Sequence, residues 1–162
     1  MTIKVGDTVP AATLYKMGAA GIDAVETGDL VKGRKVVIFG LPAAFSGTCS
    51  SAHLPSFMRT SAGFAEKGVD DIYCVAVNDA FTMAAWDKET GASAAGVTLL
   101  GDASGAFTKA LGMDFDAPVA SLFGRSKRYA LVVEDGVVTR LQEENKAGAC
   151  ELTVGEVLLE TL

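Results

Sequence analysis

The sequence predicts an α/β fold in which a mixed central sheet carries helices on both faces. Two observations lead to this prediction. Short apolar runs rich in β-branched residues alternate with segments of helical spacing. Two further apolar runs are joined at Asp135 and Gly136, the residue pair that best fits a tight two-residue hairpin, so they add antiparallel strands. We expect one domain over residues 1–162, because the chain shows no internal repeat, low-complexity tract or proline-rich linker.

The first buried strand is expected over residues 34–41, RKVVIFGL, where the continuous apolar run is typical of a strand covered on both faces. A helix is expected over residues 48–68, because a hydroxyl residue can cap its start and apolar residues recur at helical spacing: Leu54, Phe57, Met58 and Phe64. Pro55 lacks an N–H, so we expect it to kink this helix rather than to start it.

The alternation of strand and helix continues along the chain. Strands are expected over residues 71–79 and 96–102, and helices over residues 80–91 and 105–113. Asn78 or Asp79 can cap the first of these helices, and Gly112 can end the second.

The last elements are a hairpin over residues 128–141 and a helix in the tail 153–162, where Thr153 and Glu156 have the spacing of a capping box. This order of elements matches a thioredoxin-like, three-layer α/β fold with an N-terminal extension.

The charge balance limits the classes of partner. Fourteen Lys and Arg against twenty Asp and Glu give a net charge of -6, which argues against binding to nucleic acid or to an anionic membrane. No segment approaches the length of an apolar membrane span, and the N-terminus shows no basic stretch followed by an apolar region. We therefore expect a cytoplasmic protein whose partners are small molecules or proteins.

The three cysteines are widely spaced, at positions 49, 74 and 150. Their odd number and spacing are a poor framework for disulfides, and C-x-x-C pairs typical of zinc sites are lacking, so we expect no metal. Any cysteine chemistry would be that of a thiol in a reducing compartment.

Cys49 lies in the stretch LPAAFSGTCSSAHLP, at the first turn of the expected helix, where unpaired N–H groups favour a thiolate. Ser46 and Thr48 add hydroxyl groups, and Pro42 fixes the chain as it leaves the strand. From these residues alone, a reactive thiol and a small buried thiol beside a helix cap are about equally consistent with the sequence.

Pro42, Ser46 and Cys49 fit the P-x-x-x-[T/S]-x-x-C signature of peroxiredoxins. The stretches FGLPAAFSGTCSSAHLPSF, GVDDIYCVAVNDAFTMAAW and SLFGRSKRYALVVEDGVV resemble the atypical two-cysteine subgroup that includes plant type II enzymes. The resemblance covers nearly the whole chain. Two residues depart from the usual pattern: Ser46 stands where Thr is commoner, and Ala43 stands where Gly is commoner.

The resemblance implies a thiol peroxidase that reduces hydrogen peroxide and alkyl hydroperoxides. It places the peroxidatic cysteine at Cys49, the hydroxyl residue at Ser46, the shielding proline at Pro42 and the active-site arginine at Arg128. Cys49 would become a sulfenic acid. The reaction would use no bound cofactor. Glutathione, or glutaredoxin or thioredoxin acting in trans, would supply the thiol, and the relatives suggest a homodimer.

Two further residues of this stretch are expected to support the site. His53 lies four residues after Cys49 and is expected to orient the loop or to hydrogen-bond the backbone rather than to act chemically. Phe45 is expected to be an apolar wall of the pocket, whereas Trp86 and Met83 suit the core or a dimer face.

The residue that resolves the sulfenic acid is a separate question. Cys150 lies in the Gly/Ala segment NKAGACELTVGE, where animal and fungal-like members of the subgroup carry a resolving cysteine, and we rank it first. Cys74 ranks second, because it lies within an expected strand and could reach Cys49 only if the helix unwound locally. External glutathione competes with both.

Two other functions remain open. A Cys/His acyl-transfer hydrolase would need a third group to orient His53 and an acyl pocket, for which the sequence offers no motif. A non-catalytic thioredoxin-like redox-sensing module would keep the fold without turnover.

Overall fold

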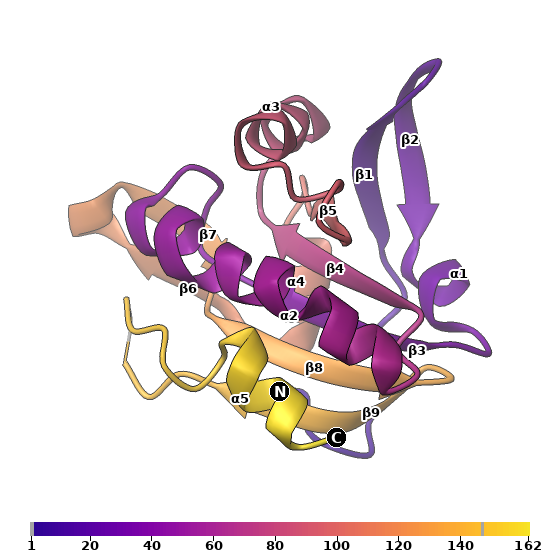
Figure 1. Ribbon diagram of the computed structural model, residues 1–162. Coiled ribbons are helices and arrows are strands. Elements are labelled where there is room, and N and C mark those ends of the chain that lie inside the picture. Colours follow the sequence, from indigo (N-terminus) through magenta and orange to yellow (C-terminus); the bar gives the residue numbers. More distant parts are fainter. Residues whose placement is uncertain (1, 147) are drawn as a thin grey trace.

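A mixed β-sheet forms the centre of the computed structural model, which describes residues 2–146 and 148–162 but not the side chains of Cys49 and Ser50. In the described chain the sheet has seven strands: β1 (Thr13–Gly18), β2 (Gly21–Glu26), β3 (Lys35–Gly40), β4 (Asp71–Ala76), β5 (Val97–Gly101), β8 (Tyr129–Glu134) and β9 (Val137–Glu143). Their order is β2-β1-β5-β4-β3-β8-β9 (Figure 1). Strands β3, β4 and β5 are parallel, and the strands outside them are antiparallel to their neighbours.

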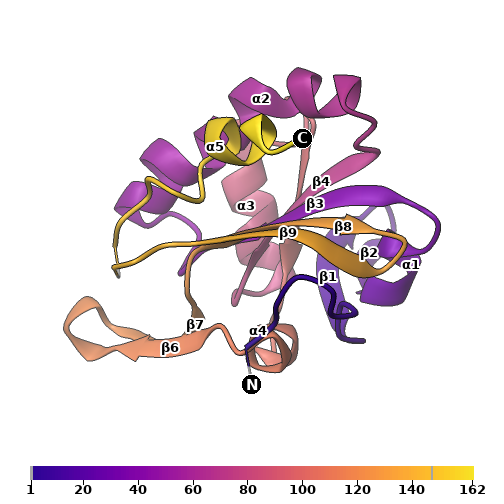
Figure 2. The same ribbon diagram turned by 90° about the horizontal axis from the view of Figure 1, so that it is seen from below.

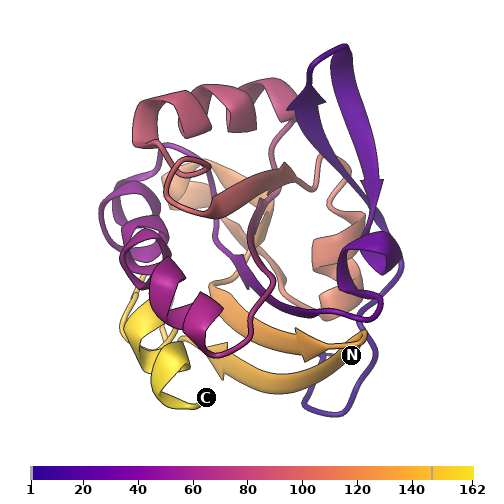
Figure 3. The same ribbon diagram turned by 45° about the vertical axis from the view of Figure 1, so that its right-hand side comes forward.

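Helices cover both faces of this sheet. They are α1 (Thr27–Val31), α2 (Leu54–Glu66), α3 (Ala80–Thr90), α4 (Ala106–Leu111) and α5 (Gly155–Glu160). Helices α2, α3 and α5 lie on one face, and α1 and α4 lie on the other (Figure 3). A small hairpin of β6 (Asp114–Ala117) and β7 (Leu122–Ser126) projects beside α4 (Figure 2). The predicted mixed α/β architecture is therefore confirmed.

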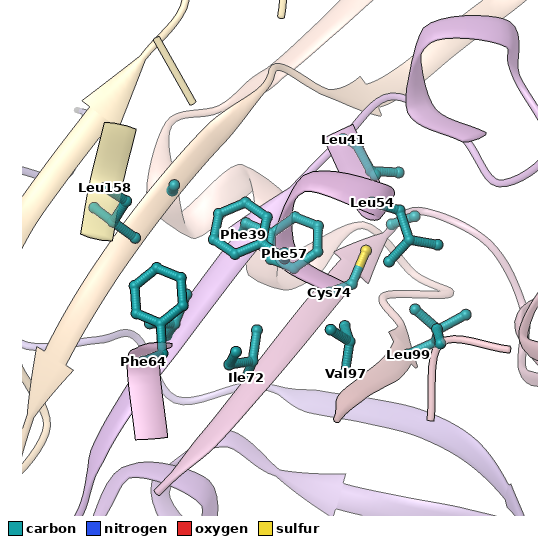
Figure 4. Packing of buried hydrophobic residues seen from close by; sticks show 14 of the residues in the cluster. Phe39, Leu41, Leu54, Phe57, Phe64, Ile72, Cys74, Val97, Leu99 and Leu158 are labelled. Carbon is teal, nitrogen blue, oxygen red and sulfur yellow. The ribbon is translucent and has the colours of Figure 1, made fainter. Parts of the chain in front are cut away.

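The alternation of side chains along the strands divides the core into two apolar clusters. Residues such as Phe39 and Cys74 face α2, whereas Ile38 and Val75 face α4. Figure 4 shows the cluster under α2, in which Phe39 stacks on Phe57 at a centroid distance of 4.0 Å. Because β3 and β4 are buried on both faces, their carboxyl ends are rigid positions from which a site can be built.

Several local predictions are confirmed. Asp79 caps α3, since its Oδ1 accepts a hydrogen bond from the N–H of Thr82 at 2.7 Å. Gly112 ends α4 with φ of 73°. Asp135 and Gly136 both have positive φ, 47° and 83°, as a two-residue hairpin between β8 and β9 requires.

Other predictions are wrong. Residues Cys49–His53 form a π-helical turn, so the regular helix begins at Leu54 and Pro55 lies in its first turn, where its missing N–H costs nothing. Thr153 and Glu156 form no capping box, because the residue that precedes α5 is Val154 and no side chain caps this helix. The predicted N-terminal extension, in contrast, is confirmed, and it adds β1 and β2 to the sheet because β1 pairs with both β2 and β5.

Candidate active site

The loop at residues 41–46 leaves the carboxyl end of β3, next to the end of the parallel strand β4. Pro42 is buried there, between strand and loop. The N–H of Ala44 donates to Oδ1 of Asn78, which follows β4, at 3.0 Å. Asn78 thus ties the two strand ends together rather than capping α3. This edge of a parallel sheet is a common location for functional sites.

Cys49 begins the π-helical turn that follows this loop. Its side chain lies outside the described part of the structure, so its role as the nucleophile stays a prediction. The π-helical turn inserts a wider turn than an α-helix, and His53 therefore does not occupy the position directly above Cys49 that α-helical spacing implied.

His53 is completely buried and makes two hydrogen bonds. Its Nδ1 lies 3.3 Å from Nη1 of Arg128, and its Nε2 lies 3.1 Å from the carbonyl oxygen of Thr153. A guanidinium can only donate and a carbonyl can only accept, so Nδ1 is the acceptor and Nε2 carries the proton. Burial, together with the nearby Arg128 cation, lowers the pKa of His53 to about 3. The ring is neutral at physiological pH.

Arg128 lies directly before β8 and is only 7 % exposed. The preceding residue is held by a hydrogen bond from the N–H of Lys127 to the carbonyl of Met113 at 2.7 Å. The guanidinium contacts His53, so the arginine and the turn that begins at Cys49 are joined through the imidazole.

A cavity of about 220 Å³ brings Pro42 and Arg128 together. These two residues are separated widely in the sequence but line the same space. The other residues around this cavity are Phe115, Lys127, Glu144, Asn145, Lys146 and Gly148. The wall therefore combines apolar surface with several charged groups.

The two predicted hydroxyl residues, Ser46 and Thr48, lie between Pro42 and Cys49 in the chain but do not line this cavity. Ser46 is partly buried, and its Oγ donates to the carbonyl oxygen of Ala43 at 2.9 Å. This bond leaves the lone pairs of Oγ as acceptors, so the group must rotate before it can donate to another oxygen. Thr48 is also partly exposed, at the start of the helical path.

Phe45 does not line the cavity that Pro42 and Arg128 share, so its place at the Cys49 pocket stays a prediction. It is 52 % exposed and has a positive φ of 65°. Its ring lies 6.4 Å from that of Trp86, at another hollow of about 550 Å³ that Pro55 and Met58 also line. Trp86 itself is completely buried in the core under α2, as expected.

The two remaining cysteines occupy different environments. Cys74 is completely buried in β4, and Figure 4 shows its sulfur directed toward the α2 side of the sheet, near Leu54 and Phe57. Cys150 is partly exposed in the segment between β9 and α5. Of these two thiols, Cys150 is therefore the more accessible.

Two residues of the cavity, Phe115 and Glu144, were not predicted from the sequence. Glu144 directly follows β9 and belongs to no recognisable motif. Phe115 lies in the β6–β7 hairpin, which the sequence did not predict. Residues 2–146 and 148–162, apart from the two undescribed side chains, contain no cluster of three His, Cys, Asp or Glu suited to a metal ion. No helix of this part of the chain is long and apolar enough to cross a membrane.

Comparison with known proteins identifies the family. Residues 4–157 match the family model described as Redoxin. The chain is 44 % identical to the chloroplastic peroxiredoxin-2E-2 of Oryza sativa subsp. japonica, over 99 % of this chain and 73 % of that protein. It is 43 % identical to the mitochondrial peroxiredoxin-2F of Arabidopsis thaliana, over 81 % of this chain and 65 % of that protein.

A solved structure supports the same assignment. The crystal structure of reduced Prx3 from Vibrio vulnificus in complex with H2O2 superposes with a TM-score of 0.91. The identity is 39 %, and the match covers 99 % of each chain. The thioredoxin-like fold and the peroxiredoxin resemblance are both confirmed.

The expected cytoplasmic location is wrong, because the relatives with a stated compartment are chloroplastic or mitochondrial proteins. Net charge limits the classes of charged partner but does not indicate a compartment. With the family model, the relatives and the fold in agreement, the chain belongs to the redoxin family and is a peroxiredoxin, a thiol-dependent peroxidase.

Proposed function

We propose that Cys49 is the nucleophile with which the chain reduces hydrogen peroxide and alkyl hydroperoxides. One observation carries the proposal: Pro42 and Arg128 line one cavity beside the turn that Cys49 begins. The relative from Vibrio vulnificus, whose solved complex contains H2O2, supports this choice of substrate.

In the proposed reaction, the Cys49 thiolate attacks one peroxide oxygen as the O–O bond breaks. The sulfur is oxidised to a sulfenic acid, and the other oxygen leaves with the bonding electron pair and takes up a proton to give water or an alcohol. Negative charge therefore develops on the departing oxygen, and the site must stabilise it.

Arg128 is the residue we assign to this charge. Its cation is buried at the cavity, where the low dielectric strengthens its attraction for the departing oxygen and for the thiolate. Ser46 first accepts a hydrogen bond from the peroxide, because its own proton is directed to Ala43. Pro42 shields the site, and Thr48 supports the start of the helical turn.

The structure disfavours a Cys/His hydrolase. A catalytic histidine must accept a proton near physiological pH, whereas the pKa of His53 is lowered to about 3 by burial and by Arg128. Both ring nitrogens of His53 are also occupied, by Arg128 and by Thr153. These contacts support a positioning role for the imidazole.

Peroxide consumption by purified variants tests the assignment of Cys49. We expect Cys49→Ser to lose turnover completely and Arg128→Lys to lose about a hundredfold in the rate of Cys49 oxidation, because a displaced charge stabilises the departing oxygen poorly. Cys74→Ser serves as the matched control and keeps this first step. Equal peroxide consumption by wild type and Cys49→Ser would refute the proposal.

For the second half of the cycle, we propose Cys150 as the first candidate to resolve the sulfenic acid. Its partial exposure supports this ranking, whereas Cys74 lies completely buried beneath α2. Attack of a thiol on the sulfenic acid forms a disulfide and releases water, after which an external thiol reduces the disulfide. Glutathione, glutaredoxin and thioredoxin remain the candidate donors, and direct attack by glutathione on Cys49 competes with Cys150.

Intact mass after one equivalent of peroxide, compared among wild type, Cys74→Ser and Cys150→Ser, distinguishes these routes. An intramolecular disulfide that persists in Cys150→Ser would reverse the ranking in favour of Cys74. A glutathione adduct on Cys49 in the wild type would favour the external thiol.

We also propose that residues 1–162 act as one domain and pair as a homodimer. Exposed apolar side chains support pairing: Phe45, Phe81, Val119 and Phe123 are between 52 % and 106 % exposed. They belong to the loop after β3, the start of α3 and the β6–β7 segment. Large apolar side chains of this kind are typical of a surface that another protein covers.

A further inference from the structure

Glu144 holds the segment between β9 and α5 in place through its carboxylate. Three consecutive backbone N–H groups donate to it: Glu151 at 3.0 Å, Leu152 at 2.9 Å and Thr153 at 2.6 Å. The hydroxyl of Thr153 donates to the same carboxylate at 2.6 Å. Partial burial alone would raise the pKa of Glu144, but these hydrogen bonds hold it below its usual range. The clamp is therefore a carboxylate at neutral pH.

The chain of hydrogen bonds continues from Thr153 to the active-site arginine. The carbonyl oxygen of Thr153 accepts from Nε2 of His53, and Nδ1 of His53 accepts from Nη1 of Arg128. Thr153 and His53 are completely buried, and Arg128 nearly so. Water therefore cannot easily replace any of these bonds if one partner moves.

We propose that Glu144 is a positioning residue for peroxide reduction, which orients Arg128 through Thr153 and His53. The proposal rests on the function assigned above to Cys49 and Arg128. With Thr153 clamped, its carbonyl selects the tautomer of His53 that protonates Nε2 and leaves Nδ1 as an acceptor. Nδ1 then accepts a hydrogen bond from Nη1 of Arg128. Because the guanidinium is planar and rigid, this bond also fixes the direction of its other N–H groups.

The hydrogen bonds to Glu144 also keep its carboxylate away from the Arg128 guanidinium. Glu144 and Arg128 line the same cavity. A carboxylate that could move there would compete with the peroxide for the guanidinium. The hydrogen bonds from residues 151–153 keep the carboxylate engaged with the chain, so a single interaction both fixes the segment and preserves the charge of the pocket.

The test compares Glu144→Gln with Glu143→Gln in the chain of residues 1–162. The two substitutions remove the same charge from neighbouring residues, but Glu143 is exposed and is not part of the clamp. We expect Glu144→Gln to reduce the second-order rate constant for oxidation of Cys49 by hydrogen peroxide about tenfold to hundredfold. We expect Glu143→Gln to match the wild type in stopped-flow measurements.

The imidazole of His53 gives a second readout that general loss of packing would not produce. His53 is the only histidine in the sequence, so its ring nitrogen signals in NMR are unambiguous. We expect the wild type to show a neutral ring protonated at Nε2 that does not titrate down to about pH 5. In Glu144→Gln the signals should shift toward a mixture of tautomers.

Each outcome bears on the proposal. Slower oxidation together with a changed His53 spectrum supports it. Slower oxidation with an unchanged spectrum overturns it, because the effect then does not pass through His53, and so does an equal loss in Glu143→Gln. An unchanged rate overturns it as well.

If Glu144→Gln does not fold, Thr153→Val replaces it. Thr153→Ser is then the control, because it keeps the hydroxyl and is expected to retain the wild-type rate. Failure of this inference leaves Cys49→Ser inactive, whereas failure of the proposed function leaves Cys49→Ser active.

Discussion

At the scale of single residues, the proton on His53 is determined by its neighbours. A donor lies on one side of the buried ring and an acceptor on the other, so a second proton would face the Arg128 cation. The sequence placed this histidine near Cys49 but did not reveal either partner. Arg128 and Thr153 lie far from it along the chain, and only the folded sheet brings the three residues together.

The buried neutral ring makes stability depend on pH. In the unfolded chain an imidazole has a pKa of about 6.5, whereas burial and Arg128 lower the pKa of His53 to about 3 in the folded protein. Because the unfolded state binds the extra proton, the contribution of His53 to stability is complete above about pH 6.5 and is lost as the pH falls toward about 3. Between these two pKa values, the unfolding free energy that His53 contributes falls by up to about 1.4 kcal/mol for each unit of pH.

The variant His53→Gln tests this dependence, because glutamine does not titrate. Urea unfolding at several values between about pH 7 and about pH 5 should show a steeper loss of unfolding free energy for the wild type than for the variant. Subtracting the curve of unfolding free energy against pH of one protein from that of the other cancels the contributions of the acidic residues, which both proteins share. Parallel curves would show that the folded ring takes up its proton normally.

At the scale of secondary structure, α5 lies unusually close to α2 at Gly155. A Cβ at this position would overlap Oγ1 of Thr60 and would lie 2.7 Å from the carbonyl oxygen of Ser56. The N–H of Gly155 donates to Oγ of Ser56 at 2.9 Å, and that hydroxyl donates to the carbonyl of His53 at 2.6 Å. The close approach therefore connects the C-terminal helix to the turn that contains His53.

We expect Gly155→Ala to lower the unfolding free energy by about 1–3 kcal/mol, because the added methyl group must push the two helices apart. Gly28→Ala in α1 is the matched control. Within the described part of the chain no atom lies within 4 Å of a Cβ at Gly28, so alanine should be neutral or stabilising by up to about 1 kcal/mol. Urea denaturation measures both, and equal stabilities of the two variants would contradict the packing argument.

The sequence predicted these elements unequally well. The strands over β3, β4, β5 and the β8–β9 hairpin carry strong apolar runs and clear turn residues, and they were found. Strand β2 was not found, because most of its residues are exposed and no apolar run marks it. The π-helical turn at Cys49–His53 was not found either, since α and π spacing cannot be distinguished from residue types alone.

At the scale of the whole molecule, the exposed apolar side chains predict a dimer that one substitution can dissociate. We expect Phe123→Glu to dissociate the proposed dimer into monomers, because a charged group at a buried contact is costly to desolvate. Val5→Glu is the control, since Val5 is similarly exposed but lies in the N-terminal segment. Light scattering coupled to size exclusion gives the mass of each, and a monomeric wild type would contradict the expectation.

The grouping of Pro42 with Arg128 in one site could be predicted only from a resemblance to a known family. Pro42 and Arg128 share a cavity, but the distance between them in the sequence leaves no local pattern that pairs them. Their pairing came only from the resemblance of two separate stretches to peroxiredoxins. Glu144 lies in neither stretch, and the three N–H groups that donate to its carboxylate belong to a segment without regular secondary structure, which no sequence pattern predicts.

The contact between Phe45 and Trp86 gives the molecule a built-in optical probe. Trp86 is the single tryptophan of the sequence, and its ring contacts the loop that leads to Cys49. Indole fluorescence depends on the polarity and motion of its immediate surroundings. Any rearrangement of this loop as Cys49 is oxidised should therefore change the emission of the native protein, so the catalytic cycle can be followed in real time without an attached dye.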